Sequence, residues 1–281
     1  MSARQRLRLD WQRGNVRNLR AAYERARHVT PEGPHEWQMI DAGDRLIRLL
    51  VHNPGIHRDR AIFYFHGGGW IVGSPSTHAD ISEALAAASG LPVISIDYRL
   101  APEHKAEAAL ADGLAVIGHY LGIEGAFASG ILAGDSAGGA LALATASRAR
   151  RMGLQIAGAM SFYGGFGLTA NPRLHGAAAA RDGLDAGSMR RYWLAANASA
   201  GEGICSLPAL ARGLDAPVYL LIAGRDPLRN DSLALARALR AKAHPVTIDP
   251  HPFEGHSFLQ SSCARRSKQI AFRRMADWIG S

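Results

Sequence analysis

Residues 130–139 read GILAGDSAGG and join a short apolar run to the start of an Ala/Leu-rich segment. Ser136 therefore stands at a strand–turn–helix junction, where the flanking glycines let the helix and the strand approach closely. A serine in such a strained turn projects its hydroxyl group above the sheet edge. The alternatives are an idle serine in a glycine-rich turn and a phosphate loop, but neither Gly-Lys-Ser/Thr nor Gly-x-Gly-x-x-Gly occurs here. We interpret Ser136 as a candidate nucleophile.

The same order of apolar run, turn and helical segment repeats along the chain. Near-continuous apolar strands that alternate with helices are typical of a mainly parallel sheet covered on both faces, so the sequence predicts an α/β fold. The predicted strands are 61–65, 92–96, 130–133, 157–163, 217–223 and 245–249. The predicted helices are roughly 77–89, 103–121, 138–152, 231–243 and 265–279, with an earlier helix from about Val16 and a hairpin over 37–53. Residues 166–207 break the rhythm and are predicted to be a lid-like insertion with one helix around 188–196.

Composition excludes several classes of protein. The chain has 281 residues, 47% of them apolar and 20% charged, which predicts one globular domain without a disulfide framework. The net charge of +8 comes largely from arginines at separate helix ends, and no nucleic-acid motif accompanies them, so we expect no nucleic-acid partner. No apolar run is long enough to span a bilayer and the N-terminal segment lacks the apolar core of a secretion signal. We therefore expect no membrane partner and a cytoplasmic location.

A second glycine-rich loop, His66-Gly67-Gly68-Gly69-Trp70, directly follows the predicted strand 61–65. An enzyme that transfers acyl groups needs N–H donors aimed at the oxygen on which negative charge develops. Consecutive glycines present bare backbone N–H groups to such a point, and the N–H of Ala137 supplies another. Three glycines exceed what a tight turn requires, so the loop predicts an oxyanion hole.

A nucleophilic serine also needs a base and an acid that orients the base. Asp226 follows the predicted strand 217–223, and His256 follows the predicted strand 245–249. Because the carboxyl ends of parallel strands meet at one edge of a sheet, we expect both side chains to lie near Ser136.

Other residues compete for these two roles. His244 ends a helix and His251 stands between prolines, so neither occupies the loop after a strand as well as His256 does. Asp231 begins a helix, where we expect it to act as a cap, and Asp249 is left as an alternative acid.

A metal site is a weaker interpretation of the same region. His251, Glu254 and His256 have a spacing close to that of a zinc-binding helix, but the histidines are five residues apart and prolines and a glycine interrupt them. We predict no metal and no cofactor.

Together these residues resemble the hormone-sensitive-lipase family of α/β-hydrolases, in its bacterial carboxylesterase branch. The resemblance rests on HGGGW at 66–70, DYRLAPEH at 97–104, GDSAGG at 134–139, DPLRND at 226–231 and GHSF at 255–258. It implies an α/β-hydrolase fold with a mostly parallel central sheet, helices on both faces and a small helical cap. Residues 1 to about 36 and 166–207 would form that cap within a single domain, 1–281. Ser257 departs from the family, which usually has glycine there.

The resemblance also assigns roles to single residues. Ser136 would be the nucleophile, Asp226 the acid and His256 the base. The oxyanion donors would be Ala137, Gly68 and Gly69, with Gly67 as a further candidate. The candidate walls of the substrate pocket, each of which could equally belong to the core, are Trp70, Asp135, Tyr163, Trp193 and Phe258.

The function that this machinery predicts is hydrolysis of short-chain carboxylic esters through an acyl-enzyme, with a small-molecule ester as substrate. The same groups could cleave a lactone, an arylformamide or an N-acetyl amide, and the HGG-x-W sequence also resembles arylformamidases. A hydrolase-fold protein that binds a small ligand without turnover is the alternative from another class, and a missing triad residue would favour it. None is missing here. Dimers occur in the family, which leaves a homodimer open.

Overall fold

The computed structural model describes residues 16–56, 58–122, 125–167, 171–198, 203 and 205–281. The predicted cap residues 1–15 lie outside these ranges. Within them, no helix is both long enough and apolar enough to cross a bilayer.

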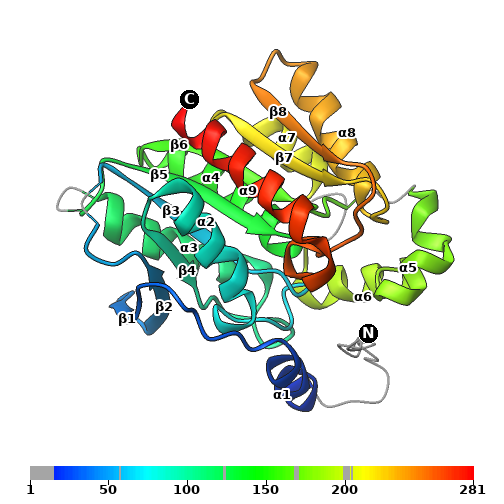
Figure 1. Cartoon of the computed structure of the whole chain (residues 1–281), viewed down its shortest axis with the longest axis horizontal. Helices are drawn as coiled ribbons and strands as arrows, with labels where there is room; N and C mark the ends of the chain where they lie inside the picture. Colours follow the sequence, from blue (N-terminus) through cyan, green and yellow to red (C-terminus); the bar gives the residue numbers. More distant parts are fainter. Residues whose placement is uncertain (1–15, 57, 123–124, 168–170, 199–202, 204) are drawn as a thin grey trace.

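An eight-stranded sheet runs through the middle of the molecule in the order β1-β2-β4-β3-β5-β6-β7-β8 (Figure 1). β1 pairs antiparallel with β2 and β2 pairs antiparallel with β4, whereas every other pair is parallel. The prediction of a mostly parallel sheet is therefore confirmed. The strands are β1 (His35–Asp41), β2 (Leu46–His52), β3 (Arg60–Phe65), β4 (Val93–Ile96), β5 (Ser129–Asp135), β6 (Ile156–Phe162), β7 (Val218–Ala223) and β8 (Val246–His251).

Helices cover both faces of this sheet. α2 (Ala79–Ser89) and α9 (Arg265–Gly280) pack against each other on one face, in front of the sheet in Figure 1. The other face carries α3 (Ala106–Leu121), α4 (Ala137–Arg151), α7 (Leu207–Gly213) and α8 (Arg229–Arg240). Alternate residues of β3 supply the two cores: Phe63 and Phe65 join the one beneath α3 and α4, and Ile62 and Tyr64 join the one beneath α2 and α9. A strand buried on both faces is apolar at every position, which explains the unbroken apolar runs in the sequence.

Three helices lie near the end of the sheet at which the parallel strands finish: α1 (Val16–Arg27), α5 (Ala177–Asp182) and α6 (Ala186–Ala196) (Figure 1). The single helix predicted for 166–207 corresponds to α6, but α5 and the short turn η2 (Pro172–His175) were not predicted. The Ala-rich start of α5 has no apolar periodicity that distinguishes a helix from a loop. The remaining short turns are η1 (Ser76–His78), η3 (Phe258–Gln260) and η4 (Ser262–Ala264).

Candidate active site

Ser136 lies in the sharp turn between β5 and α4. Its φ of 53° and ψ of −120° are unusual for a residue with a side chain, so the surrounding structure must hold the turn in place. Two glycines make the turn sterically possible: a Cβ atom on Gly134 would collide with the carbonyl of Gly138, and one on Gly138 would collide with the carbonyl of Phe65. The predicted strand–turn–helix junction is therefore present, and its serine has the strained backbone expected from the sequence.

His256 and Asp226 lie next to this serine. Nε2 of His256 is 2.9 Å from Oγ of Ser136, although 120 residues separate the two in the sequence. Nδ1 of His256 is 2.7 Å from Oδ2 of Asp226. The other carboxylate oxygen of Asp226 accepts a 2.7 Å hydrogen bond from the N–H of Leu228, which fixes the carboxylate in the loop after β7. The structure thus brings the three predicted side chains together in one hydrogen-bonded chain.

The charge of His256 depends on two opposing effects. Burial by itself would lower its pKa, but the neighbouring Asp226 carboxylate favours the protonated ring and outweighs burial. The pKa of His256 is therefore raised from its ordinary value. An imidazole with an oriented carboxylate behind it is suited to accept a proton from the serine and to carry it as a cation.

One aromatic ring packs against His256, and a second ring packs behind the first. Tyr163 packs edge-on against His256 with ring centroids 5.2 Å apart, and Phe258 packs against Tyr163 at 5.9 Å. Both rings are buried, and the hydroxyl group of Tyr163 has no hydrogen-bond partner in the described part of the chain. Of the predicted pocket walls, Tyr163 is therefore the one that contacts the histidine, and Phe258 lies behind it.

The HGGG loop follows β3 and lies close to the serine turn, since a Cβ atom on Gly138 would collide with the carbonyl of His66. Gly68 and Gly69 have φ values of 116° and 62°, and the carbonyl of Gly68 accepts hydrogen bonds from the N–H groups of Ile71 and Val72. Within the described ranges, the N–H groups of Gly68, Gly69 and Ala137 have no hydrogen-bond acceptor. Unpaired amides at such a point are the donors that an oxyanion requires.

Gly67 differs from the other two glycines. Its N–H donates a 2.7 Å hydrogen bond to Oδ1 of Asp135, which also accepts a 2.7 Å hydrogen bond from the hydroxyl group of Tyr64. The Gly67 amide is thus already paired, so the expectation that it is a further oxyanion donor needs correction. An amide that faces a buried carboxylate points away from the position of the oxyanion.

Asp135 itself lies beneath the loop and not at the surface of a pocket. Only 1% of its side chain is exposed, and Nε2 of His78 lies 3.7 Å from its second oxygen. Burial raises the pKa of this carboxyl group. Asp135 is therefore not a pocket-wall residue, as was expected from the sequence. Its carboxylate instead joins the serine turn to the HGGG loop through the hydrogen bond from Gly67.

The DYRLAPEH segment, to which the sequence assigned no chemistry, packs against the same loop. The hydroxyl group of Tyr98 donates a 2.6 Å hydrogen bond to the carbonyl of His66, and the N–H of Ala101 donates to the carbonyl of Trp70. Arg20 of α1 also reaches this region and donates to the carbonyls of Ile71 and Ala101. The segment and α1 thus hold the HGGG loop from outside.

The two remaining predicted wall residues, Trp70 and Trp193, are buried in the hydrophobic core. Trp70 ends the HGGG loop, and Trp193 of α6 belongs to the same buried cluster as Met189 and Tyr192 of that helix. The residue before it, Tyr192, was missed: a Cβ atom on Gly69 would lie 2.5 Å from its ring, so this tyrosine covers the loop. Only the packing of α6 decides which of two adjacent aromatic residues faces the loop, so the sequence held no signal for it.

The competing acids and bases have other partners. His251 pairs with Asp249 at 3.0 Å, which in turn accepts a 2.7 Å hydrogen bond from the hydroxyl group of Tyr219. His244 contacts the carbonyl of Ala216. The N-cap residue of α8 is Leu228 and not Asp231 as predicted, because Asp231 lies within the first turn of the helix. Its carboxylate accepts a 2.8 Å hydrogen bond from the N–H of Phe166 at the start of the insertion. In the ranges that the structure covers, no group of three acidic, histidine or cysteine side chains could hold a metal ion.

Comparison with known proteins agrees with this architecture. The family model described as "alpha/beta hydrolase fold" matches residues 62–260. The chain is 33% identical to Esterase LipI of Mycobacterium tuberculosis over 199 residues, which cover 66% of this chain and 62% of LipI. It is also 33% identical to the acetyl esterase of Salmonella paratyphi B over 235 residues, which cover 78% of this chain and 71% of that enzyme.

A solved structure extends the similarity to nearly the whole chain. The esterase of Pyrobaculum calidifontis superposes with a TM-score of 0.80 at 26% identity, covering 94% of this chain and 92% of that one. The family match, the relatives and the sheet order lead to one assignment. The chain belongs to the α/β-hydrolase fold, in the hormone-sensitive-lipase family of carboxylesterase-type hydrolases.

Proposed function

We propose that the chain is a serine carboxylesterase that cleaves short-chain carboxylic esters through an acyl-enzyme. The observation that carries the proposal is the hydrogen-bonded chain from Ser136 through His256 to Asp226, with distances of 2.9 and 2.7 Å. The relatives named esterase and acetyl esterase support the substrate class.

The first half of the reaction forms the acyl-enzyme. Nε2 of His256 takes the proton of Ser136 while Oγ attacks the ester carbonyl carbon, and Asp226 stabilises the resulting imidazolium. The amides of Gly68, Gly69 and Ala137 donate to the oxyanion. When the tetrahedral intermediate collapses, the bond to the alcohol oxygen breaks and His256 returns the proton to the leaving alcohol.

The second half repeats these steps with water. His256 takes a proton from the water molecule, the hydroxide attacks the acyl carbon, and the carboxylic acid leaves as Oγ of Ser136 regains its proton. No cofactor takes part in this sequence.

A small cap supports the preference for short acyl groups. We propose that α1 and the two helices of the insertion, α5 and α6, form this cap, since Arg20 of α1 bonds to the segment after the HGGG loop and Tyr192 of α6 covers Gly69. An aromatic ring over the oxyanion loop leaves little room for a long acyl chain on that side.

The test is a series of initial rates on p-nitrophenyl acetate, butyrate, octanoate and laurate, with wild type beside Ser136→Ala. We expect rates that peak at the short esters and fall by at least about 10⁴-fold in the variant. A variant as active as the wild type would refute the assignment of Ser136. If the wild type cleaves no ester, a matched set of lactones, arylformamides and N-acetyl amides distinguishes the other uses of the same machinery.

A further inference from the structure

The side chain of Gln260 joins the loop that carries His256 to two segments far away in the sequence. Its Nε2 donates a 2.8 Å hydrogen bond to the carbonyl of Thr77, 183 residues earlier, and its Oε1 accepts a 2.5 Å hydrogen bond from Nη1 of Arg27 in α1. Only 6% of Gln260 is exposed. Distant partners satisfy both polar ends of this buried amide, so the two contacts, called here the Gln260 bridge, connect three segments.

The backbone next to His256 needs a contact of this kind. Ser257, the following residue, has a φ of 58° and a ψ of 27°, in the left-handed region that favours glycine. The turn η3 comes next, and in it the N–H of Gln260 donates a 3.0 Å hydrogen bond to the carbonyl of Ser257. A residue with an unfavourable backbone keeps its conformation only where the surrounding structure holds it. One short turn therefore links the buried amide of Gln260 to the backbone that carries His256.

The Thr77 end of the bridge leads to the HGGG loop. Nδ1 of His78 lies 2.8 Å from the hydroxyl oxygen of Thr77, and Nε2 of the same ring lies 3.7 Å from Oδ2 of Asp135. The carboxylate of Asp135 accepts the hydrogen bond from the N–H of Gly67. Thr77, His78 and Asp135 are each at most 1% exposed. A row of buried polar contacts thus extends from the Gln260 bridge to the proposed oxyanion loop.

Helix α1 forms the other end of the bridge, and polar contacts on one of its faces hold it in place. No residue of α1 is fully buried. Arg20, Glu24 and Arg27 are spaced by four and three residues, so they share one face of the helix. Arg20 donates to the carbonyl of Ile71, and Glu24 accepts a 2.9 Å hydrogen bond from the hydroxyl group of Ser74. This face therefore follows the segment after the HGGG loop and ends at the Gln260 bridge.

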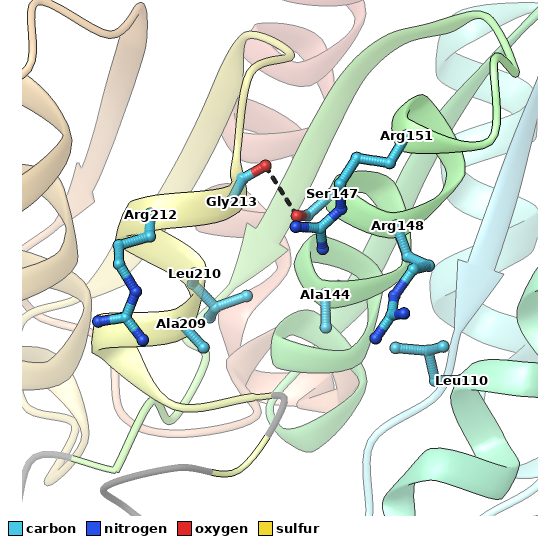
Figure 2. Close-up of a pocket in the computed structure, with 9 residues that line it drawn as sticks. All are labelled: Leu110, Ala144, Ser147, Arg148, Arg151, Ala209, Leu210, Arg212 and Gly213. Atoms are coloured by element: carbon cyan, nitrogen blue, oxygen red, sulfur yellow. Dashed lines mark hydrogen bonds between the residues drawn. The ribbon is translucent and has the colours of Figure 1, made fainter.

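A side chain that only stabilises the fold would not need this placement. Ser147 of α4 shows the difference: its hydroxyl group donates a 2.7 Å hydrogen bond to the carbonyl of Gly213 and so ties α4 to α7 beside a cavity (Figure 2). Roughly 16 Å of helix separates Ser147 from Ser136. The Gln260 bridge instead begins one turn after the proposed base and leads to the proposed oxyanion donors.

We propose that Gln260 is a positioning residue that holds His256 in place relative to the HGGG loop, and that Arg27 completes this contact from α1. The inference rests on the proposed function, in which His256 is the base. Without the bridge, Nε2 of His256 is less well aligned with Oγ of Ser136. A small loss of alignment slows proton transfer and leaves substrate binding largely unchanged.

The test is steady-state kinetics on p-nitrophenyl acetate for Gln260→Met, Arg27→Met and the double variant. Methionine keeps much of the side-chain volume and removes the hydrogen bonds. We expect kcat to fall by about tenfold in Gln260→Met and by about fivefold in Arg27→Met, with KM changed by less than about twofold. Because both residues act through one bridge, the double variant should be no slower than Gln260→Met. Arg27→Lys, which keeps a donor for the amide, should recover most of the wild-type kcat.

Two controls and one measurement separate positioning from stability. Arg25→Met removes a charge from an exposed position on α1, and Ser147→Ala removes the hydrogen bond to Gly213. Both should keep the wild-type kcat, even where Ser147→Ala lowers the midpoint of urea unfolding. Titration of the reactive serine with a fluorophosphonate gives the concentration of folded sites, so kcat is expressed per site in every variant.

Wild-type kcat per site in both Gln260→Met and Arg27→Met would overturn the positioning role, and so would additive losses in the double variant. An equal loss in Ser147→Ala would overturn it too, because the effect would then follow stability. Ser136→Ala separates this outcome from a failure of the proposed function. An active Ser136→Ala refutes both proposals, whereas an inactive one beside a normal Gln260→Met refutes only the role of Gln260.

Discussion

The N–H of Gly67 donates a 2.7 Å hydrogen bond to the carboxylate of Asp135, the residue immediately before the proposed nucleophile. This bond joins the turn that carries Ser136 to the loop that carries the proposed oxyanion donors. The carboxylate is buried and also bound to the hydroxyl group of Tyr64, so its position is fixed from both sides. Asp135 thus acts as a positioning residue: it sets where the next two amides of the loop lie relative to the serine hydroxyl group.

Replacing Asp135 with alanine is expected to lower kcat more than it changes KM. The substitution leaves the Gly67 amide and the Tyr64 hydroxyl group without an acceptor, at a cost of about 1–3 kcal/mol of stability for each buried group. A loop displaced by even a small distance loses alignment with the oxyanion, so we expect kcat to fall by about tenfold or more. Steady-state kinetics on p-nitrophenyl acetate measure this, together with the midpoint of urea unfolding.

Asp135→Asn is the matched control, because it keeps the volume and one acceptor oxygen. It should recover part of the lost kcat. If Asp135→Ala has a normal kcat and only a reduced stability, the bond to Gly67 has no part in positioning the loop.

The pH dependence of the reaction is expected to follow His256. Only the neutral ring can accept the proton of Ser136, so kcat/KM should fall as the pH drops through the pKa of His256. Since the Asp226 carboxylate raises that pKa, the acid limb should lie at a higher pH than the ordinary value for histidine predicts. A pH profile of kcat/KM in wild type gives the position of the limb.

Asp226→Asn should change this profile in two ways. The rate should fall by about 10⁴-fold, because the amide no longer orients the base or stabilises its cation. The acid limb should also move to lower pH, because burial then acts on the histidine without the opposing carboxylate.

Asp249→Asn provides the comparison, since Asp249 pairs with His251 in a similar way but outside the proposed site. Its acid limb should stay in place. An acid limb that moves in Asp249→Asn and not in Asp226→Asn would assign the base to His251.

The acyl preference is expected to depend on Tyr192. Its ring lies against Gly69 and is buried, so Tyr192→Ala opens space beside the proposed oxyanion loop. We expect the ratio of octanoate to acetate hydrolysis to rise by about tenfold, because each methylene accommodated in an apolar pocket contributes about 1–3 kcal/mol at most. Leu194→Ala on the same helix is the control: its side chain is 59% exposed, and the ratio should not change. If the ratio in Tyr192→Ala stays at the wild-type value, a side chain other than Tyr192 limits the length of the acyl chain.

The sequence predicts the parts of this molecule that depend on local pattern. The strands, the covering helices other than α7 and the meeting of Ser136, Asp226 and His256 follow from apolar runs and from the rule that parallel strands end at one edge. The short helix α7 was not predicted. The contacts that depend on packing between distant segments were not predictable. The sequence could not show that Asp135 accepts a hydrogen bond from Gly67 of the HGGG loop, nor that Asp231 accepts one from Phe166. The local sequence around an aspartate at the end of a strand or the start of a helix is the same whether its carboxylate faces a pocket, caps a helix or binds a distant backbone amide. Short helices such as α5 were not predicted for the same reason, because packing against neighbouring segments stabilises them more than their own sequence pattern does.

Close packing of α4 against β3 is expected to make Gly138 irreplaceable, whereas Gly118 of α3 should tolerate a side chain. A Cβ atom on Gly138 would collide with the backbone carbonyls of Phe65 and His66, which cannot move without shifting the strand and the HGGG loop together. Gly138→Ala should therefore destabilise the fold by more than about 2 kcal/mol and abolish activity. A Cβ atom on Gly118 would meet nothing within 4 Å, so Gly118→Ala should raise the unfolding free energy by about 0.5–1 kcal/mol through its better helix propensity. Urea unfolding of both variants measures the difference. Equal stabilities would mean that the approach of α4 to β3 does not constrain the serine turn.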